Sequence, residues 1–240
     1  MSLPADVVTW FTTGEHWRGD FGVPHRLVEH TTMSAAAIVA AAAIALPIGI
    51  WLGHRGRGGA VAINLANVGR ALPSLAILAL FQQAFGLRGW PGFGARPAFV
   101  ALVALAVPPL VTNAYVGMRG VDADVVEAAR GMGMTGGELL WRVELPIALP
   151  LVMAGLRTAA VQVVATATLA AVTAWGGLGR FIVDGFGQRD DAQVVAGAIL
   201  VGLLALATEL SLGAAERAVV SEGLRPEQVR HVKERAVVVA

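Results

Sequence analysis

Long apolar runs, separated by short segments that carry the charged residues, dominate the pattern of this chain. A helix that crosses a bilayer needs about 20 predominantly apolar residues, and five runs reach that length. We predict spans at residues 31–53, 60–85, 97–118, 147–174 and 192–214. A membrane barrel would instead show alternating segments of about ten residues, which the sequence lacks. The expected fold class is an all-α polytopic membrane protein with about five transmembrane helices.

The composition excludes most soluble classes of protein. Of the 240 residues, 56% are hydrophobic and only 15% are charged, whereas a soluble domain carries about 25% charged residues. The mean hydropathy is +0.66, and this excess of apolar residues also excludes intrinsic disorder. The net charge of +1 gives no reason to expect a nucleic-acid partner. Because there is no cysteine and all five histidines lie outside the apolar runs, we expect neither a disulfide nor a metal site.

Basic residues divide unequally between the two sides that five spans create. One side would carry ten: Arg55, Arg57, Arg119, Arg130, Arg142, Arg217, Arg225, Arg230, Lys233 and Arg235. The other would carry six: Arg18, Arg26, Arg88, Arg96, Arg180 and Arg189. The side richer in lysine and arginine is usually cytoplasmic. We therefore expect a protein of the inner cell membrane, with segment 1–29 outside and the tail 219–240 in the cytoplasm.

The segment at residues 119–146, on the expected cytoplasmic side, reads as two short helices. Asp124 precedes Glu127 by three residues, and Thr135 precedes Glu138 by three, so each pair fits a capping box. Glycines at 131 and 133 are suited to end the first helix, since glycine tolerates a positive φ. The second helix is expected at residues 136–144, leading into the fourth span. Such a rigid pair of helices is suited to docking a partner, although Glu127 could serve only as a capping acid.

The same segment resembles the signature of permease subunits of ABC importers, E-A-A-x3-G-x9-(Ile/Val)-x-L-P. Every fixed position matches: Glu127, Ala128, Ala129, Gly133, Val143, Leu145 and Pro146. Four other segments resemble the osmoprotectant branch of that family: residues 70–76, 155–159, 165–169 and 175–179. Members of this branch import glycine betaine, choline, carnitine or proline, so the resemblance implies such a substrate.

The resemblance also implies a fold, partners and residue roles. The fold would be that of a type I importer permease, also called MetI-like, over residues 30–218. The partners would be an ATP-binding subunit, a second permease subunit (identical or paralogous) and an extracytoplasmic substrate-binding protein. The residues implied in contact with the ATPase are Glu127, Ala128, Ala129, Gly133, Leu145 and Pro146. Since the chain has no G-x4-G-K-(Ser/Thr) phosphate loop, ATP and Mg are expected on the partner, with no cofactor or catalytic residue here.

Polar residues inside the apolar runs are candidates for a translocation path. Charges at such depth are costly and normally face the bundle interior or a water-filled cavity. A proline inside the second run predicts a helix break, because it frees a carbonyl in the preceding turn. The candidates are Asn67, Arg70, Pro73 and Arg157. Alternatively, the arginines join helices to each other or reach the headgroups.

Two features concern the outer side and the ligand. After the glycine-rich end of the fourth span, residues 180–186 are expected to form a short external helix, a candidate contact for the substrate-binding protein. Aromatic residues in the spans are expected at different depths, so they would not enclose a quaternary ammonium ion, which requires several ring faces. These residues are Trp51, Phe81, Phe85, Phe99 and Tyr115. We therefore expect no high-affinity ligand site within this chain.

Three alternative functions are considered. A permease of an amino-acid, methionine or sulfonate importer would carry the same signature. An intramembrane enzyme would need a nucleophile and a base within the bilayer, but no His, Cys, Asp or Lys occurs inside any expected span. A self-contained channel would leave the cytoplasmic signature without a purpose. The sequence therefore favours an importer permease.

Overall fold

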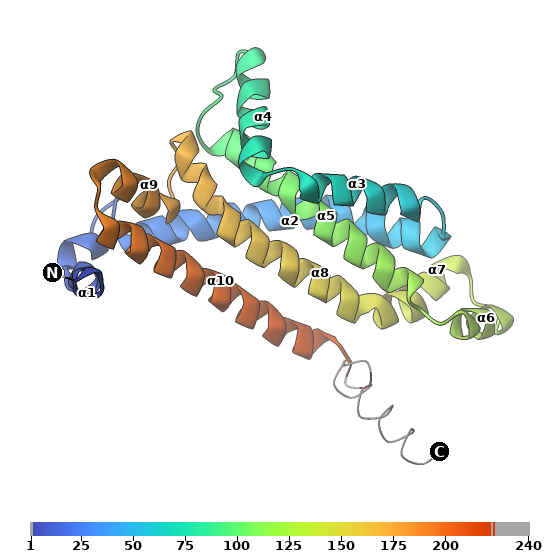
Figure 1. Cartoon of the computed structure of the whole chain (residues 1–240). Coiled ribbons are helices and arrows are strands. Elements are labelled where there is room, and N and C mark those ends of the chain that lie inside the picture. The colour runs from blue at the N-terminus through green and yellow to red at the C-terminus, as the bar shows by residue number, and fades with distance from the viewer. Residues whose placement is uncertain (1, 222, 224–240) are drawn as a thin grey trace.

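The computed structural model of the chain is a bundle of helices, and it describes residues 2–221 and 223 (Figure 1). The part of the expected tail at residues 222 and 224–240 lies outside the described residues. The helices are α1 (Leu3–Thr12), α2 (Val23–Arg55), α3 (Gly59–Ala71), α4 (Ser74–Leu87), α5 (Ala95–Arg119), α6 (Ala123–Gly131), α7 (Gly136–Leu139), α8 (Leu145–Thr166), α9 (Gly179–Gln188) and α10 (Asp191–Val219). Short helices of other kinds are the 3₁₀ helices Gly14–Trp17 and Ala167–Thr173 and the π-helical turn Leu140–Glu144.

Four segments of the described chain are long and apolar enough to cross a membrane, and they coincide with four of the expected spans. These segments are Val23–Arg55, Ala95–Arg119, Gly136–Thr173 and Asp191–Val219. The expected span at 60–85 requires correction, because it consists of two shorter helices, α3 and α4, on either side of Leu72 and Pro73. The break predicted at Pro73 is confirmed. Figure 1 shows α4 projecting away from the bundle.

A row of small residues lets α2 and α5 approach closely. Every fourth residue on one face of α2 is small and buried: Ala37, Ala41, Ala45, Gly49 and Gly53. A Cβ added at Gly49 would lie 2.7 Å from the Ala114 Cβ and 2.8 Å from the Val111 carbonyl oxygen. Small residues at such contacts are the usual means of packing membrane helices, where dispersion replaces the hydrophobic effect. This contact explains why small residues recur at every fourth position along this face of α2.

The main core lies among α2, α5 and α8. Its larger buried members include Leu102 and Leu110 of α5 and Val163 of α8, which pack against the alanines of α2. The last long helix, α10, lies beside α8 and α9. A second cluster joins α1 to α9 and α10 through Trp10, Phe181 and their neighbours. This arrangement places α1 and α9 at one end of the bundle and α6 and α7 at the other (Figure 1).

Candidate coupling segment and outer loop

The start of α6 differs from the sequence prediction. Its N-cap is Asp122, whose side chain accepts a hydrogen bond of 2.9 Å from the Asp124 backbone N–H. The expected cap, Asp124, lies instead in the first turn of the helix, where its negative charge is favoured by the helix dipole. The capping box proposed for Asp124 and Glu127 is therefore wrong. Because the cap lies five residues before Glu127, that carboxylate has no capping role and is exposed on α6.

The end of α6 explains the spacing of the signature alanine and glycine. The Met134 N–H donates to the Ala129 carbonyl at 3.2 Å, and the Gly133 N–H donates to the Arg130 carbonyl at 2.9 Å. This pair of bonds is the Schellman motif, in which the residue after the C-cap adopts a left-handed conformation. Gly133 has φ +84°, so the positive φ expected there is confirmed. Ala129 is buried beneath the turn.

The predicted capping box of α7 is confirmed. The Thr135 hydroxyl accepts from the Glu138 backbone N–H at 3.3 Å, and the Glu138 carboxylate accepts from the Thr135 backbone N–H at 3.0 Å. This backbone hydrogen bond lowers the pKa of Glu138, with further contributions from the Thr135 hydroxyl and Arg142. From α7 the chain continues through the π-helical turn into α8, which begins at Leu145 and Pro146. The two short helices are thus fixed by bonds at their ends.

An exposed surface on α6, α7 and the turn that follows combines polar and apolar groups. Glu127 and Ala128 are exposed on α6, Met132 at the end of that helix is 73% exposed, and Trp141 in the π-helical turn is 67% exposed. Apolar side chains as large and as exposed as these are candidates for burial against a partner. Sequence analysis missed Met132 and Trp141, because neither is a fixed position of the signature. We name these four residues the coupling surface.

A contact between two polar side chains joins the end of α2 to the base of α8. His54 Nδ1 contacts Glu144 Oε2, and Glu144 is only 5% exposed. The pair lies in a pocket of about 540 Å³ that Glu127 and Arg130 of α6 also line. A buried carboxylate is costly unless it is paired, so this contact fixes the coupling segment against α2. No motif in the sequence linked His54 to Glu144.

The candidate path residues lie on different helices and have different surroundings. Two carboxylates of α10 contact the Arg157 guanidinium on α8. Arg157 Nε lies 3.1 Å from Glu209 Oε1, and Nη1 lies 3.1 Å from Glu216 Oε2. This geometry favours the alternative that Arg157 joins two helices. Asn67 is exposed on α3, and Pro73 is the N-cap of α4. The Arg70 side chain lies outside the described residues.

At the opposite end of the bundle, hydrogen bonds hold the glycine-rich loop to α2. His30 is fully buried, with its Nε2 2.9 Å from the Val164 carbonyl oxygen and its Nδ1 3.2 Å from the Leu178 N–H. Because a backbone N–H can only donate, Nδ1 accepts and Nε2 donates. The Glu29 carboxylate accepts from the Gly177 N–H at 2.8 Å. A helix is present where residues 180–186 were expected to form one, as α9.

Metal binding has no support in the described part of the chain. No group of three or more His, Asp or Glu side chains there lies close enough to hold an ion. His30 is engaged by two backbone groups, and His25 and His54 each face one carboxylate, Glu29 and Glu144 respectively. The chemistry at both ends of the bundle is therefore that of contacts between segments.

Comparison with known proteins agrees with this arrangement. Residues 45–221 match the family model described as binding-protein-dependent transport system inner membrane component. The chain is 36% identical to the choline transport system permease protein OpuBB of Bacillus subtilis, over 84% of this chain and 90% of that protein. It is 37% identical to the glycine betaine/carnitine/choline transport system permease protein OpuCB of the same organism, over 82% of this chain and 88% of that protein.

The fold is also similar to that of a solved transporter. A chain of the MetNI methionine ABC transporter, in inward-facing conformations, superposes with a TM-score of 0.71. The match covers 80% of this chain and 94% of that chain, at 21% sequence identity. At that identity the likeness supports the fold and carries no information on the substrate.

Proposed function

Because the chain belongs to the family of binding-protein-dependent transport system inner membrane components, we propose that it is the permease of an ATP-driven importer of osmoprotectants such as glycine betaine, choline and carnitine. It is a transport subunit, not an enzyme, and its family binds no cofactor in this subunit. The observation that carries the substrate class is its identity of 36–37% to permeases of choline and betaine transport over most of the chain.

In this proposal the coupling surface contacts the ATPase subunit. Glu127 offers a carboxylate to a basic residue, and the small Ala128 permits close approach. Ala129 and Gly133 fix the direction of α6 through the Schellman motif. Leu145 and Pro146 begin α8, so a displacement of the segment reaches that span directly. Met132 and Trp141 add apolar area that would become buried on docking.

Two further partners belong to the proposal. Four or five spans are too few to enclose a path, so a second permease subunit, identical or paralogous, completes it within the lipid bilayer. An extracytoplasmic binding protein would dock near α9 and the loop that His30 and Glu29 hold. The path would pass the break between α3 and α4, where Asn67, Arg70 and Pro73 lie. The role of Arg157 would be to join α8 to α10 along its wall.

The proposed orientation places the coupling surface in the cytoplasm and α9 outside. Single cysteines can be introduced without background, since the chain has none. We expect Asp122→Cys and Gly136→Cys to react with a membrane-impermeant maleimide only after the cells are permeabilised, whereas Gln188→Cys reacts in intact cells. All three positions are exposed in the structure. Labelling of positions 122 and 136 in intact cells would show that the topology is the reverse of the one proposed.

Uptake measurements test the proposed substrate class. The permease, expressed with its ATPase and binding protein in cells that lack osmoprotectant uptake, is expected to import radiolabelled glycine betaine, choline or carnitine. Radiolabelled methionine, histidine and a sulfonate are tested in the same cells for the alternative importers. Uptake of one of these, with no uptake of any quaternary ammonium compound, would replace the proposed substrate class with an amino-acid or sulfonate class.

A further inference from the structure

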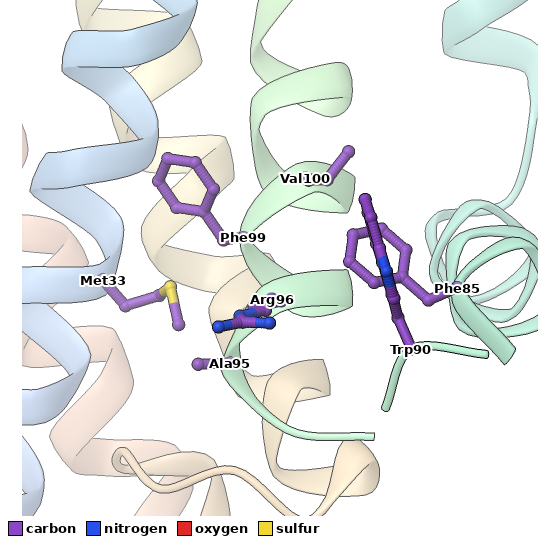
Figure 2. A pocket seen from close by; sticks show the side chains of 7 residues that line it. All are labelled: Met33, Phe85, Trp90, Ala95, Arg96, Phe99 and Val100. Carbon is purple, nitrogen blue, oxygen red and sulfur yellow. The ribbon is translucent and has the colours of Figure 1, made fainter. Parts of the chain in front are cut away.

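An open pocket of about 540 Å³ lies at the start of α5 (Figure 2). It is lined by Met33 of α2, Phe85 of α4, Trp90 of the following loop, and Arg96 and Phe99 of α5. The Phe85 and Trp90 rings meet edge to face, with centroids 5.5 Å apart. Of the aromatic residues expected at different depths in the spans, Phe85 and Phe99 line this pocket together. Trp90 lies outside the apolar runs, so sequence analysis did not include it.

The pocket lies at the end of the bundle that carries the glycine-rich loop. The Gly94 N–H, immediately before α5, donates to the Thr173 carbonyl at 2.6 Å. Met33 follows His30, which holds that loop, by one turn of α2. In the orientation proposed above, the pocket therefore opens toward the outside of the cell.

Arg96, an exposed residue, is the one charged residue among those that line this largely apolar pocket. Arg96 occupies the first turn of α5, a turn with no acidic residue and no side-chain cap. A cation there is disfavoured by the helix dipole, whereas an anion is favoured. Within the described part of the chain, the Arg96 guanidinium has no hydrogen-bond acceptor and no carboxylate partner. In Figure 2 that group lies between Met33 and Phe99 on one side and Phe85 and Trp90 on the other.

We propose that this pocket is a transient binding site for a zwitterion that carries both a trimethylammonium group and a carboxylate, such as glycine betaine or carnitine. The trimethylammonium group packs against the Trp90 and Phe85 rings through cation–π attraction. The carboxylate accepts charge-assisted hydrogen bonds from Arg96. The inference rests on the proposed function for its substrate class, and it assigns the selecting residues within that class.

The same charge discriminates against choline. Choline carries the trimethylammonium group but has a hydroxyl in place of the carboxylate, so Arg96 repels its positive charge with nothing to offset the repulsion. Selectivity of this kind comes from an unfavourable contact with the competitor as much as from an attractive one with the ligand. The rings line an open pocket and do not enclose the cation. Binding is therefore weak, which agrees with the expectation that this chain has no high-affinity site.

Ligand-observed NMR on the purified transporter tests the site. Saturation transfer to the methyl protons is titrated with glycine betaine and with choline, using the full-length permease assembled with its ATPase and without a binding protein. We expect glycine betaine to bind at least about tenfold more tightly, because its carboxylate accepts charge-assisted hydrogen bonds from Arg96 that choline cannot accept. Arg96→Gln should bring the two affinities together, and Arg96→Glu should reverse their order. Trp90→Ala should weaken both ligands about threefold.

Two matched variants control for nearby changes. Arg88→Gln removes an arginine at the end of α4, and Phe93→Ala removes an exposed ring in the loop that carries Trp90, yet neither residue lines the pocket. Both should leave the two affinities unchanged. The ratio of two affinities within one sample does not depend on the fraction of folded protein, so partial misfolding of a variant cannot imitate the result.

The possible results distinguish a failure of the pocket proposal from a failure of the proposed function. Equal affinities in the unmodified transporter, a ratio that Arg96→Gln leaves unchanged, or no saturation with either ligand would overturn the site. Uptake of quaternary ammonium compounds together with any of these results would leave the proposed function intact. A transporter that imports none of them fails the uptake test, and the ratio of NMR affinities still decides whether the pocket selects a zwitterion.

Discussion

Replacing Gly133 with valine is expected to abolish import while the spans still insert in the membrane. Gly133 has φ +84°, and a left-handed conformation costs an L-residue about 1–2 kcal/mol, more when the side chain is β-branched. No atom lies within 4 Å of an added Cβ, so the penalty is in the backbone alone. Relief of that strain would break the two hydrogen bonds that end α6 and change the direction of the coupling surface. In ATPase assays we expect activity that substrate no longer stimulates, while the amount of permease in the membrane stays normal.

Gly131 provides a matched control two residues away. It is also exposed with open space around it, but its φ is not positive and it belongs to α6. Gly131→Val should therefore retain most of the transport rate, because the added side chain meets nothing and the backbone needs no change. Equal loss of transport in both variants would show that bulk at this surface matters and that the turn conformation does not.

The second large effect is expected from Gly49→Val in α2. A Cβ at this position would lie within 2.8 Å of both the Ala114 side chain and the Val111 carbonyl, a contact that only a displacement of α2 from α5 can relieve. Overpacking of this kind usually costs about 1–3 kcal/mol. We expect a lower temperature of unfolding for the purified transporter and a reduced yield of assembled complex.

The control for this change is Gly202→Val in α10. Gly202 also lies in a long apolar helix, and no atom lies within 4 Å of its added Cβ in the described structure. The intrinsic preference of valine for a helix is the same at both positions, so the difference between the variants isolates the contact with α5. A temperature of unfolding lowered equally by both substitutions would contradict the close packing of α2 on α5.

The sequence predicted the features that local chemistry determines. Four of the five spans follow from apolar length, and the capping box at Thr135 and the turn at Gly133 follow from residue types at fixed spacing. The α6 cap was misplaced by two residues because Asp122 and Asp124 are both acceptable caps and only the folded backbone selects between them. The second span was predicted too long, since its apolar length concealed the separation of α3 from α4.

Contacts between distant segments were beyond the reach of pattern analysis. Arg157 was predicted for a path or a helix contact, and only the position of α10 reveals its two carboxylate partners. His54 and Glu144 are 90 residues apart, and nothing in either local sequence indicates their pairing. Trp90 was overlooked because it belongs to a loop. In each case the determining factor is the packing of helices, which residue spacing does not encode.

The two histidines of α2 have a mechanical consequence. His30 bonds the glycine-rich loop near one end of the helix, and His54 contacts the base of α8 near the other. The 24 residue steps from His30 to His54 span roughly 36 Å of continuous helix at 1.5 Å per residue. Bending would concentrate at Pro47, the one proline inside that helix. A protein bound at each end would thus act on a single stiff rod, and by thermodynamic reciprocity each would change the other's affinity by the same factor.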